Sequence, residues 1–151
     1  MFQRKRGLIL NMGSFAGSIP SPMLATYSAS KAFLTTFTAA LADELKSNGI
    51  YVQHLNTFYV VSKMSKLRKP SLLVPLPSTY VSSVLKHIGQ PCGAAFSGRP
   101  GTSTPYWSHS IVDFAMGLVG WKALFIGYTH ELHKSIRKRA LRKIERDAKK
   151  L

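Results

Sequence analysis

Three side chains near the start of the chain are of the types that can reduce a carbonyl group. Tyr27 and Lys31 stand four positions apart, and Ser14 lies thirteen positions before Tyr27. Reducing a ketone requires a proton donor to oxygen while hydride reaches carbon, and a phenol with a pKa of about 10 is poorly matched to that task near neutrality. An ammonium about 4 Å away favours the phenolate by about 4 kcal/mol at an effective dielectric near 20, which nearly removes the mismatch. A serine hydroxyl can hold the same oxygen by a hydrogen bond.

The four-residue spacing of a tyrosine and a lysine does not by itself distinguish a catalytic pair from a chance pair. Tyr59 and Lys63 stand at the same spacing, which makes neighbours of two residues on a helix. Tyr27 lies at the start of a helical pattern and follows Ser14 at the end of a predicted strand, whereas Tyr59 lies in a predicted loop. We therefore expect only the first set to converge.

Hydrophobic runs predict a strand, a helix and a second strand around these residues. Residues 7–12 and 50–55 are short apolar runs of the kind that form buried parallel strands. Between them a helix is predicted to begin with Ser21 as cap and Pro22 at its first position, and to end at 48–49. Its inward-facing stripe is predicted to be Leu34, Phe37, Leu41 and Leu45. Such a unit implies a parallel sheet with a helical crossover.

The remaining residues give weaker signals. Residues 57–79 read as an irregular segment, a helix is predicted from Pro77 to about Ile88, and residues 89–108 read as a Gly/Pro loop. Residues 111–128 are mostly apolar, but their charged residues and glycines favour a buried or interfacial helix over a membrane crossing, which needs about 20 apolar residues.

The charge distribution argues against a nucleic-acid partner despite a formal net charge of +15. Residues 4–6 carry three cations, and residues 130–151 carry nine Lys or Arg against three acids, so most of the excess lies at the two ends. A single cysteine, Cys92, cannot form an internal disulfide, which fits a reducing compartment. His130 and His133 lack the spacing and partners of a zinc site, so no metal is expected.

The segments around the three candidate residues resemble a known enzyme family. Asn11-Met-Gly-Ser14 followed by Tyr27-x-x-x-Lys31 is similar to the signature of the short-chain dehydrogenase/reductase family. Longer stretches resemble a branch of that family, the microsomal 3-oxoacyl-CoA reductases that act on very long chains in fungi. The stretches that carry this likeness are residues 7–17, 25–33, 64–70 and 103–109. The resemblance covers most of the chain and weakens past about Gly120.

The resemblance implies an α/β fold. Residues 1–109 would be the carboxy-terminal half of a short-chain dehydrogenase/reductase domain, a partial Rossmann-like, doubly wound parallel sheet without its amino-terminal strands. Residues 110–151 would be an apolar, then basic, helical extension that can associate with a membrane. The Gly-x-Gly-x-x-Gly phosphate loop of the family does not occur in the sequence, so we expect the chain alone to bind NADPH poorly and to be inactive by itself.

The resemblance also implies roles for individual residues. Tyr27 would be the proton donor and would also contact the cofactor. Lys31 would lower the pKa of Tyr27 and hold the nicotinamide ribose, and Ser14 would bind and orient the substrate carbonyl. Where the family has Pro-Gly-x-Val-x-Thr, this chain has residues 57–62, with Val60 and Ser62 as candidate cofactor contacts. A loop cap is the alternative role for Ser62.

The implied function is NADPH-dependent reduction of very-long-chain 3-oxoacyl-CoA to 3-hydroxyacyl-CoA in fatty acid elongation. The resemblance places this activity at the endoplasmic reticulum membrane, with the catalytic part facing the cytoplasm. It implies an acyl-CoA substrate and other elongase components as partners. One alternative is a 17β-hydroxysteroid or other carbonyl reductase, which the same three residues would serve. An alternative of another class is a basic module that binds a membrane surface or nucleic acid.

Overall fold

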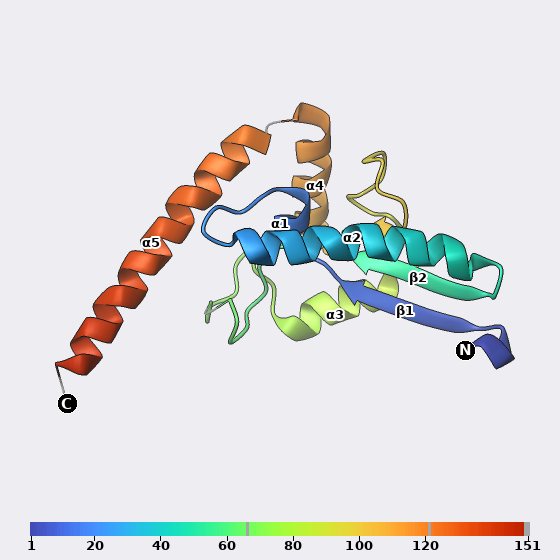
Figure 1. The fold of residues 1–151 in the computed structure, drawn as a ribbon, viewed down its shortest axis with the longest axis horizontal. Coiled ribbons are helices and arrows are strands. Elements are labelled where there is room, and N and C mark those ends of the chain that lie inside the picture. The colour runs from blue at the N-terminus through green and yellow to red at the C-terminus, as the bar shows by residue number, and fades with distance from the viewer. Residues whose placement is uncertain (66, 121, 150–151) are drawn as a thin grey trace.

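A three-stranded parallel sheet in the order β1-β2-β3 forms the centre of the molecule (Figure 1). The computed structural model describes residues 1–65, 67–120 and 122–149. The strands are β1 (Gly7–Met12), β2 (Ile50–Leu55) and β3 (Thr102–Ser103). β1 and β2 pair along all six of their residues and have the predicted bounds, whereas β3 lies inside the segment predicted as a Gly/Pro loop. Among the described residues β1 pairs with β2 alone, so it is an outer strand.

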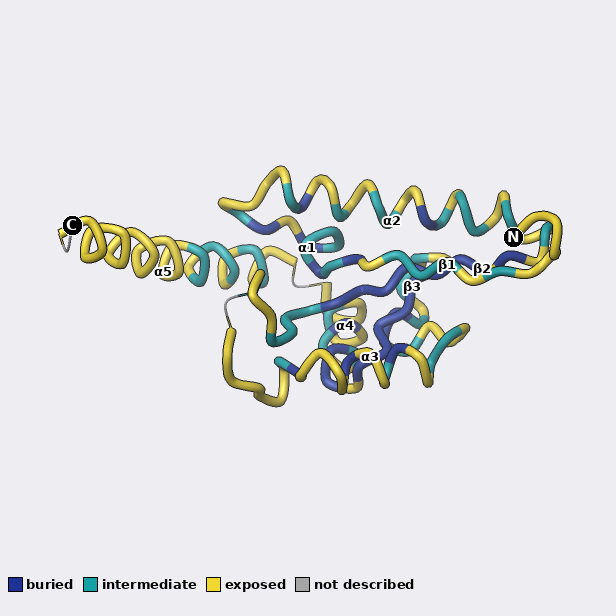
Figure 2. The backbone as a smooth tube through the Cα atoms, turned by 90° about the horizontal axis from the view of Figure 1, so that it is seen from below, coloured by how far each residue is buried: buried dark blue, intermediate teal, exposed yellow. Residues whose placement is uncertain are grey.

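Helices cover both faces of this sheet. They are η1 (Phe2–Arg4), α1 (Phe15–Ser18), α2 (Ala25–Lys46), α3 (Pro77–Lys86), α4 (Trp107–Val119) and α5 (Lys122–Ala148). Figure 2 shows α2 on one side of the sheet and α3 and α4 on the other. The predicted fold class, an open parallel α/β sheet followed by a helical carboxy-terminal region, is confirmed.

The start of α2 differs from the prediction. The helix begins at Ala25 and not at Pro22, because Met23 has a φ of 68°, in the left-handed region where a right-handed helix cannot continue. Ser21 does not cap α2 with its side chain; its backbone N–H donates instead to the Ser28 hydroxyl at 3.0 Å. The chain therefore makes a turn before the helix, and the first turn of α2 carries no side-chain cap.

The face of α2 that packs on the sheet is more polar than predicted. Phe37 is 44% exposed, and its ring stacks on the exposed Phe33 at 5.8 Å. The fully buried residue is its neighbour Thr38, which donates to the Leu34 carbonyl at 2.6 Å and accepts from the Asn11 amide at 2.9 Å. The helix thus joins β1 through a hydrogen bond, and the prediction of Phe37 in the core was wrong.

The predicted apolar segment 111–128 is divided between two helices. Gly120, with a φ of 66°, ends α4, and α5 then runs away from the sheet (Figure 1). None of the helices within the described ranges combines the length and the apolar character that crossing a bilayer demands. The sequence predicted a domain boundary between residues 109 and 110, which lies inside α4. The division into two parts stays a prediction. Residues 121, 150 and 151 of the predicted extension lie outside the described residues.

Candidate active site

Ser14 lies at the carboxyl end of β1, where ligands bind in open parallel sheets. It is the N-cap of α1, and its Oγ accepts a hydrogen bond from the Ala16 N–H at 3.2 Å. The preceding residue, Gly13, donates its backbone N–H to the Leu55 carbonyl at 2.8 Å. The serine is therefore fixed between the ends of two neighbouring strands.

Two glycines allow this end of β1 to pack tightly. A Cβ atom on Gly13 would collide with the imidazole of His54, which lies directly beneath it. A Cβ atom on Gly17 would lie 2.7 Å from the backbone carbonyl carbon of Lys31. Only a glycine at position 17 lets α1 approach the backbone of α2 this closely, and this approach brings Ser14 toward the lysine.

Tyr27 and Lys31 lie in the first two turns of α2. The Lys31 ammonium donates a hydrogen bond to the Met12 carbonyl at 2.9 Å, and it lies 5.7 Å from the centroid of the Tyr27 ring. Both side chains are half-buried, as is Ser14. All three line one pocket, so the structure brings together the residues that the sequence analysis selected.

That pocket has a volume of about 640 Å³ and a mostly apolar lining. Its walls come from the end of β1, from α1, from the start of α2, from the loop after β2, and from α3, α4 and α5. Val60 and Ser62 line it too. The Ser62 hydroxyl is engaged with Ser65, whose Oγ lies 3.1 Å away and whose N–H donates at 3.0 Å. These bonds form a loop cap, and the cofactor contacts of Val60 and Ser62 stay predictions.

The two residues that stand in place of the family's Pro-Gly pair build an aromatic cluster. Thr57 is buried, and its hydroxyl lies 2.5 Å from the Tyr80 hydroxyl. Burial raises the pKa of Tyr80 to about 12. The Phe58 ring packs edge-on against Phe15 at 5.4 Å and His109 at 5.8 Å. The departure from the family pattern therefore has a packing role between α1, α3 and α4.

His54 lies in the layer beneath the three candidate residues, and the sequence analysis did not select it. It is 1% exposed, and its Nε2 lies 3.3 Å from the Thr35 hydroxyl. Burial is the main reason that its pKa is lowered to about 4, and the nearby charges of Arg99 and Lys31 contribute to that lowering. The imidazole is thus neutral at physiological pH, and it supports Gly13 without adding a second positive charge beside Lys31.

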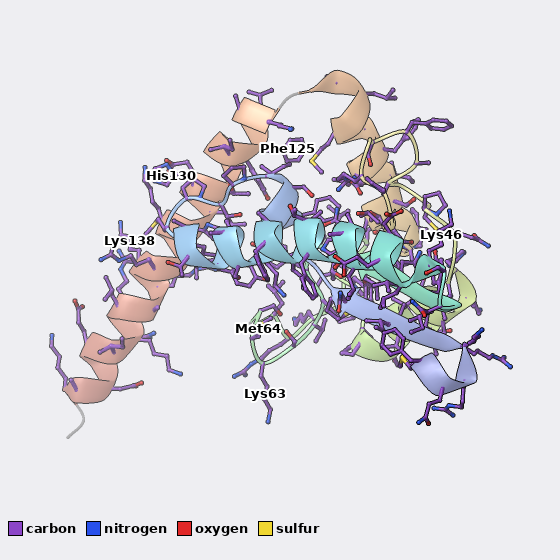
Figure 3. All side chains as sticks on the ribbon, turned by 45° about the vertical axis from the view of Figure 1, so that its right-hand side comes forward. Lys46, Lys63, Met64, Phe125, His130 and Lys138 are labelled. Atoms are coloured by element: carbon purple, nitrogen blue, oxygen red, sulfur yellow. The ribbon has the colours of Figure 1, made fainter. Side chains whose placement is uncertain are left out.

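Tyr59 is a second phenol in the pocket. The sequence analysis placed it in a loop that does not converge with the site; the loop is correct, but the residue lines the same pocket as Tyr27. Burial raises the pKa of Tyr59, and the neighbouring phenols of Tyr128 and Tyr27 add to that effect. Its apparent partner Lys63 points outward at the far end of the loop (Figure 3).

A buried polar network holds the far side of α1. Asp113 of α4 is 4% exposed and accepts from Arg99 at 2.7 Å, from the Asn56 amide at 3.1 Å and from the Thr104 hydroxyl. Arg99 also donates to the Ser18 hydroxyl at 3.0 Å. One carboxylate thereby connects α4 with α1 and with the ends of β2 and β3. Asp113 is the acidic residue within the mostly apolar segment 111–128, and its hydrogen bonds hold these elements together.

The start of α5 forms part of the pocket wall. Phe125, labelled in Figure 3, lines the pocket together with Thr129 and His133. The His133 Nδ1 lies 2.8 Å from the Pro22 carbonyl oxygen, which joins α5 to the turn before α2. Across residues 1–65, 67–120 and 122–149, no three His, Cys, Asp or Glu side chains are grouped so that they could hold a metal ion.

Comparisons with known proteins show which proteins this chain is similar to. The model of the short chain dehydrogenase family matches residues 1–72. The very-long-chain 3-oxoacyl-CoA reductase of Laccaria bicolor is 65% identical over 149 residues, which cover 99% of this chain and 44% of that protein. The reductase of the same name from Coprinopsis cinerea is 66% identical over 149 residues, with the same coverage of 99% and 44%. This chain thus spans less than half the length of these relatives.

A solved structure shares the fold. It comes from work on the stereoselectivity of a 7beta-hydroxysteroid dehydrogenase, and it superposes with a TM-score of 0.63 at 18% identity, over 84% of this chain and 49% of that one. At this identity the likeness concerns the arrangement of the elements alone. Residues 1–72 thus match the short chain dehydrogenase family, and nearly the whole chain is similar to the fungal reductases.

Proposed function

We propose that this chain is the catalytic part of a reductase that converts very-long-chain 3-oxoacyl-CoA to 3-hydroxyacyl-CoA with NADPH, as a step of fatty acid elongation. The match of residues 1–72 to the short chain dehydrogenase family supports an oxidoreductase with a nicotinamide cofactor. The names of relatives that match 99% of the chain support a ketoacyl thioester as the substrate. The choice of NADPH and the place in elongation are parts of the proposal.

The observation that carries the proposal is the common pocket of Ser14, Tyr27 and Lys31. A ketone oxygen held there can accept a hydrogen bond from the serine hydroxyl and a proton from the phenol. The mostly apolar walls of the pocket suit an acyl chain better than a polar substrate. A steroid would also fit such walls, so substrate choice must be decided by experiment.

The residues present fit the nicotinamide end of the cofactor. The Lys31 ammonium already donates to a backbone oxygen inside the pocket and can offer its other hydrogens to ribose hydroxyls. When bound, NADPH supplies the hydride that reaches C3 of the substrate and leaves as NADP⁺. Tyr27 gives its proton to the carbonyl oxygen, Lys31 stabilises the phenolate that results, and Ser14 holds the oxygen in place.

A chimeric enzyme tests the proposal. Residues 1–151 would replace the matching segment of the Laccaria bicolor reductase, and NADPH oxidation would be measured with a long-chain 3-oxoacyl-CoA and separately with a 17-ketosteroid. We expect turnover of the thioester, and a loss of roughly 10²- to 10⁴-fold in kcat for Tyr27→Phe. Tyr51→Phe removes an exposed phenol from β2 and serves as the matched control, which should retain full activity.

Two results would overturn parts of the proposal. A Tyr27→Phe chimera that turns over at the parent rate would remove the phenol from the mechanism. Reduction of the ketosteroid alone would favour the hydroxysteroid alternative. Separately, fluorescence titration of the isolated chain with NADPH should show weak binding or none, since no glycine-rich phosphate loop occurs in its sequence.

We place the enzyme at the endoplasmic reticulum membrane, with its catalytic part facing the cytoplasm and other elongase components as its partners. The single cysteine and the basic carboxy-terminal helix support this location. Fluorescence microscopy of the tagged chimera with a marker of that membrane tests it, and uniform cytosolic fluorescence would contradict it.

A further inference from the structure

The α5 helix has two parts with different surroundings. Its first part lies against the pocket through Phe125, Thr129 and His133. From Lys134 to Lys149 every residue is exposed, and this part extends beyond the body of the molecule (Figures 1 and 2). We call residues 134–149 the free half of α5. A helix that leaves the fold in this way gains no stability from tertiary packing on its outer part.

The free half is strongly cationic. It holds eight Lys or Arg side chains against two acids. Along residues 122–149, the salt bridge recorded within α5 joins Lys134 to Glu131 at 2.8 Å. The positive field of the remaining cations is thus directed at solvent and needs a negatively charged partner surface.

An apolar stripe runs along the same segment. Ile136, Ala140 and Ile144 are spaced by four residues and share one face. Ile136 is 40% exposed and Ile144 is 64% exposed. Arg139, Arg142 and Arg146, at steps of three and four, share a different face. The free half is therefore amphipathic, with apolar and cationic faces that are both open to solvent.

We propose that the free half of α5 docks on the surface of an anionic lipid bilayer, with Ile136 and Ile144 at the level of the acyl boundary and the arginine side chains among the headgroup phosphates. The cationic face indicates an anionic partner. The apolar stripe favours a bilayer over nucleic acid, because a bilayer has an apolar layer that the exposed isoleucines can enter and a phosphate backbone has none. This deepens the membrane part of the proposed function and rests on that part alone.

Vesicle flotation with the full chain tests the docking. Phosphatidylcholine vesicles with and without phosphatidylserine would be compared at low and high salt. We expect binding to the anionic vesicles only, weakened by salt. The triple variant Arg139→Glu, Arg142→Glu, Arg146→Glu should bind roughly a hundredfold more weakly. A second variant, Ile136→Ser with Ile144→Ser, keeps every charge and should also bind more weakly.

A matched control separates this surface from net charge. Arg4→Glu, Lys5→Glu, Arg6→Glu makes the same change in charge at the other end of the chain and should bind like the parent. The proposal would be overturned if both triple variants lost binding equally, or if the α5 triple variant bound fully. It would also be overturned by equal binding to neutral vesicles, or by binding to duplex RNA without binding to vesicles. Reductase activity is not measured, so the two proposals can fail separately; circular dichroism verifies that each variant is folded.

Discussion

The strand–helix–strand unit of residues 7–55 and the carboxy-terminal region of residues 89–149 are organised by different forces. In the first unit, apolar runs form strands with the bounds that the pattern predicts. In the second, a buried carboxylate connects pieces that have no regular pattern: a loop arginine, a strand of two residues and a helix with both apolar and charged residues. Local pattern specifies the first region, and long-range polar contacts specify the second.

This contrast has a consequence for the site. Tyr27 and Lys31 belong to the first region, and the second region adds Val112, Met116 and Phe125 to the apolar pocket wall, much of which comes from residues 57–81 between the two regions. The two regions can therefore be disturbed separately, and the stability of the following variants tests each region in turn.

Removing the carboxylate of Asp113 should have the largest effect. Asp113→Ala leaves Arg99 without its ion partner and two buried groups without their acceptor, so unfolding in urea should show a loss of about 3–5 kcal/mol. Asp43→Ala on the exposed side of α2 is the matched control and should stay within about 0.5 kcal/mol of the parent. A loss below about 1 kcal/mol for Asp113→Ala would contradict the assignment of the carboxylate as the centre of this region.

A methyl group at Gly17 should have an intermediate effect. Gly17→Ala places its Cβ against the backbone of α2, which cannot give way cheaply, and should cost about 1–3 kcal/mol. Gly117→Ala in α4 meets nothing within 4 Å and should instead stabilise the chain by up to about 1 kcal/mol. The opposite signs of two identical substitutions can be read from thermal unfolding. Equal effects would show that α1 does not depend on close approach to α2.

His54 should contribute to the pH dependence of stability. Near neutral pH its effect should be smaller than the effects of the changes at Asp113 and Gly17. Its pKa is lowered from 6.5 to about 4, so between these values the unfolded chain binds the extra proton. The contribution of His54 is complete above pH 6.5 and is lost as the pH falls toward 4, up to about 3 kcal/mol.

Urea unfolding of the parent and of His54→Asn at several pH values checks this. The variant should lose part of the slope between pH 6.5 and 4, while some slope remains because burial also lowers the pKa of His109. Above pH 7 the two proteins should have parallel profiles. Identical slopes below pH 6.5 would show that the neutral form of His54 is not required.

The sequence predicted the first region well because its signals are short-range. Strands 7–12 and 50–55 and the end of α2 follow from apolar runs and a glycine stop. Ser14, Tyr27 and Lys31 were found by residue type and spacing, and the structure places them on one pocket. The start of α2 was missed because the left-handed turn at Met23 leaves no signature in residue type.

The other failures have a common physical origin. Thr38 replaces Phe37 in the packed face because its hydroxyl satisfies the Asn11 amide, a contact 27 residues distant in sequence. β3 is too short to show a period, and its pairing with β2 fixes it. Tyr59 and His54 reach the site through the path of the chain after β2 and the packing beneath Gly13. The position of each of these residues depends on contacts with residues that are distant in the sequence.

The outer edge of β1 has a practical consequence for handling the isolated chain. Within the described residues, no strand pairs with the outer edge of β1, and Leu8 and Met12 of this strand are exposed. Such an edge is a template for another strand. The net charge of +15 keeps molecules apart only while it is unscreened. We therefore expect added salt to promote edge-to-edge association of the isolated chain, and dilute, low-salt buffer to keep it dispersed.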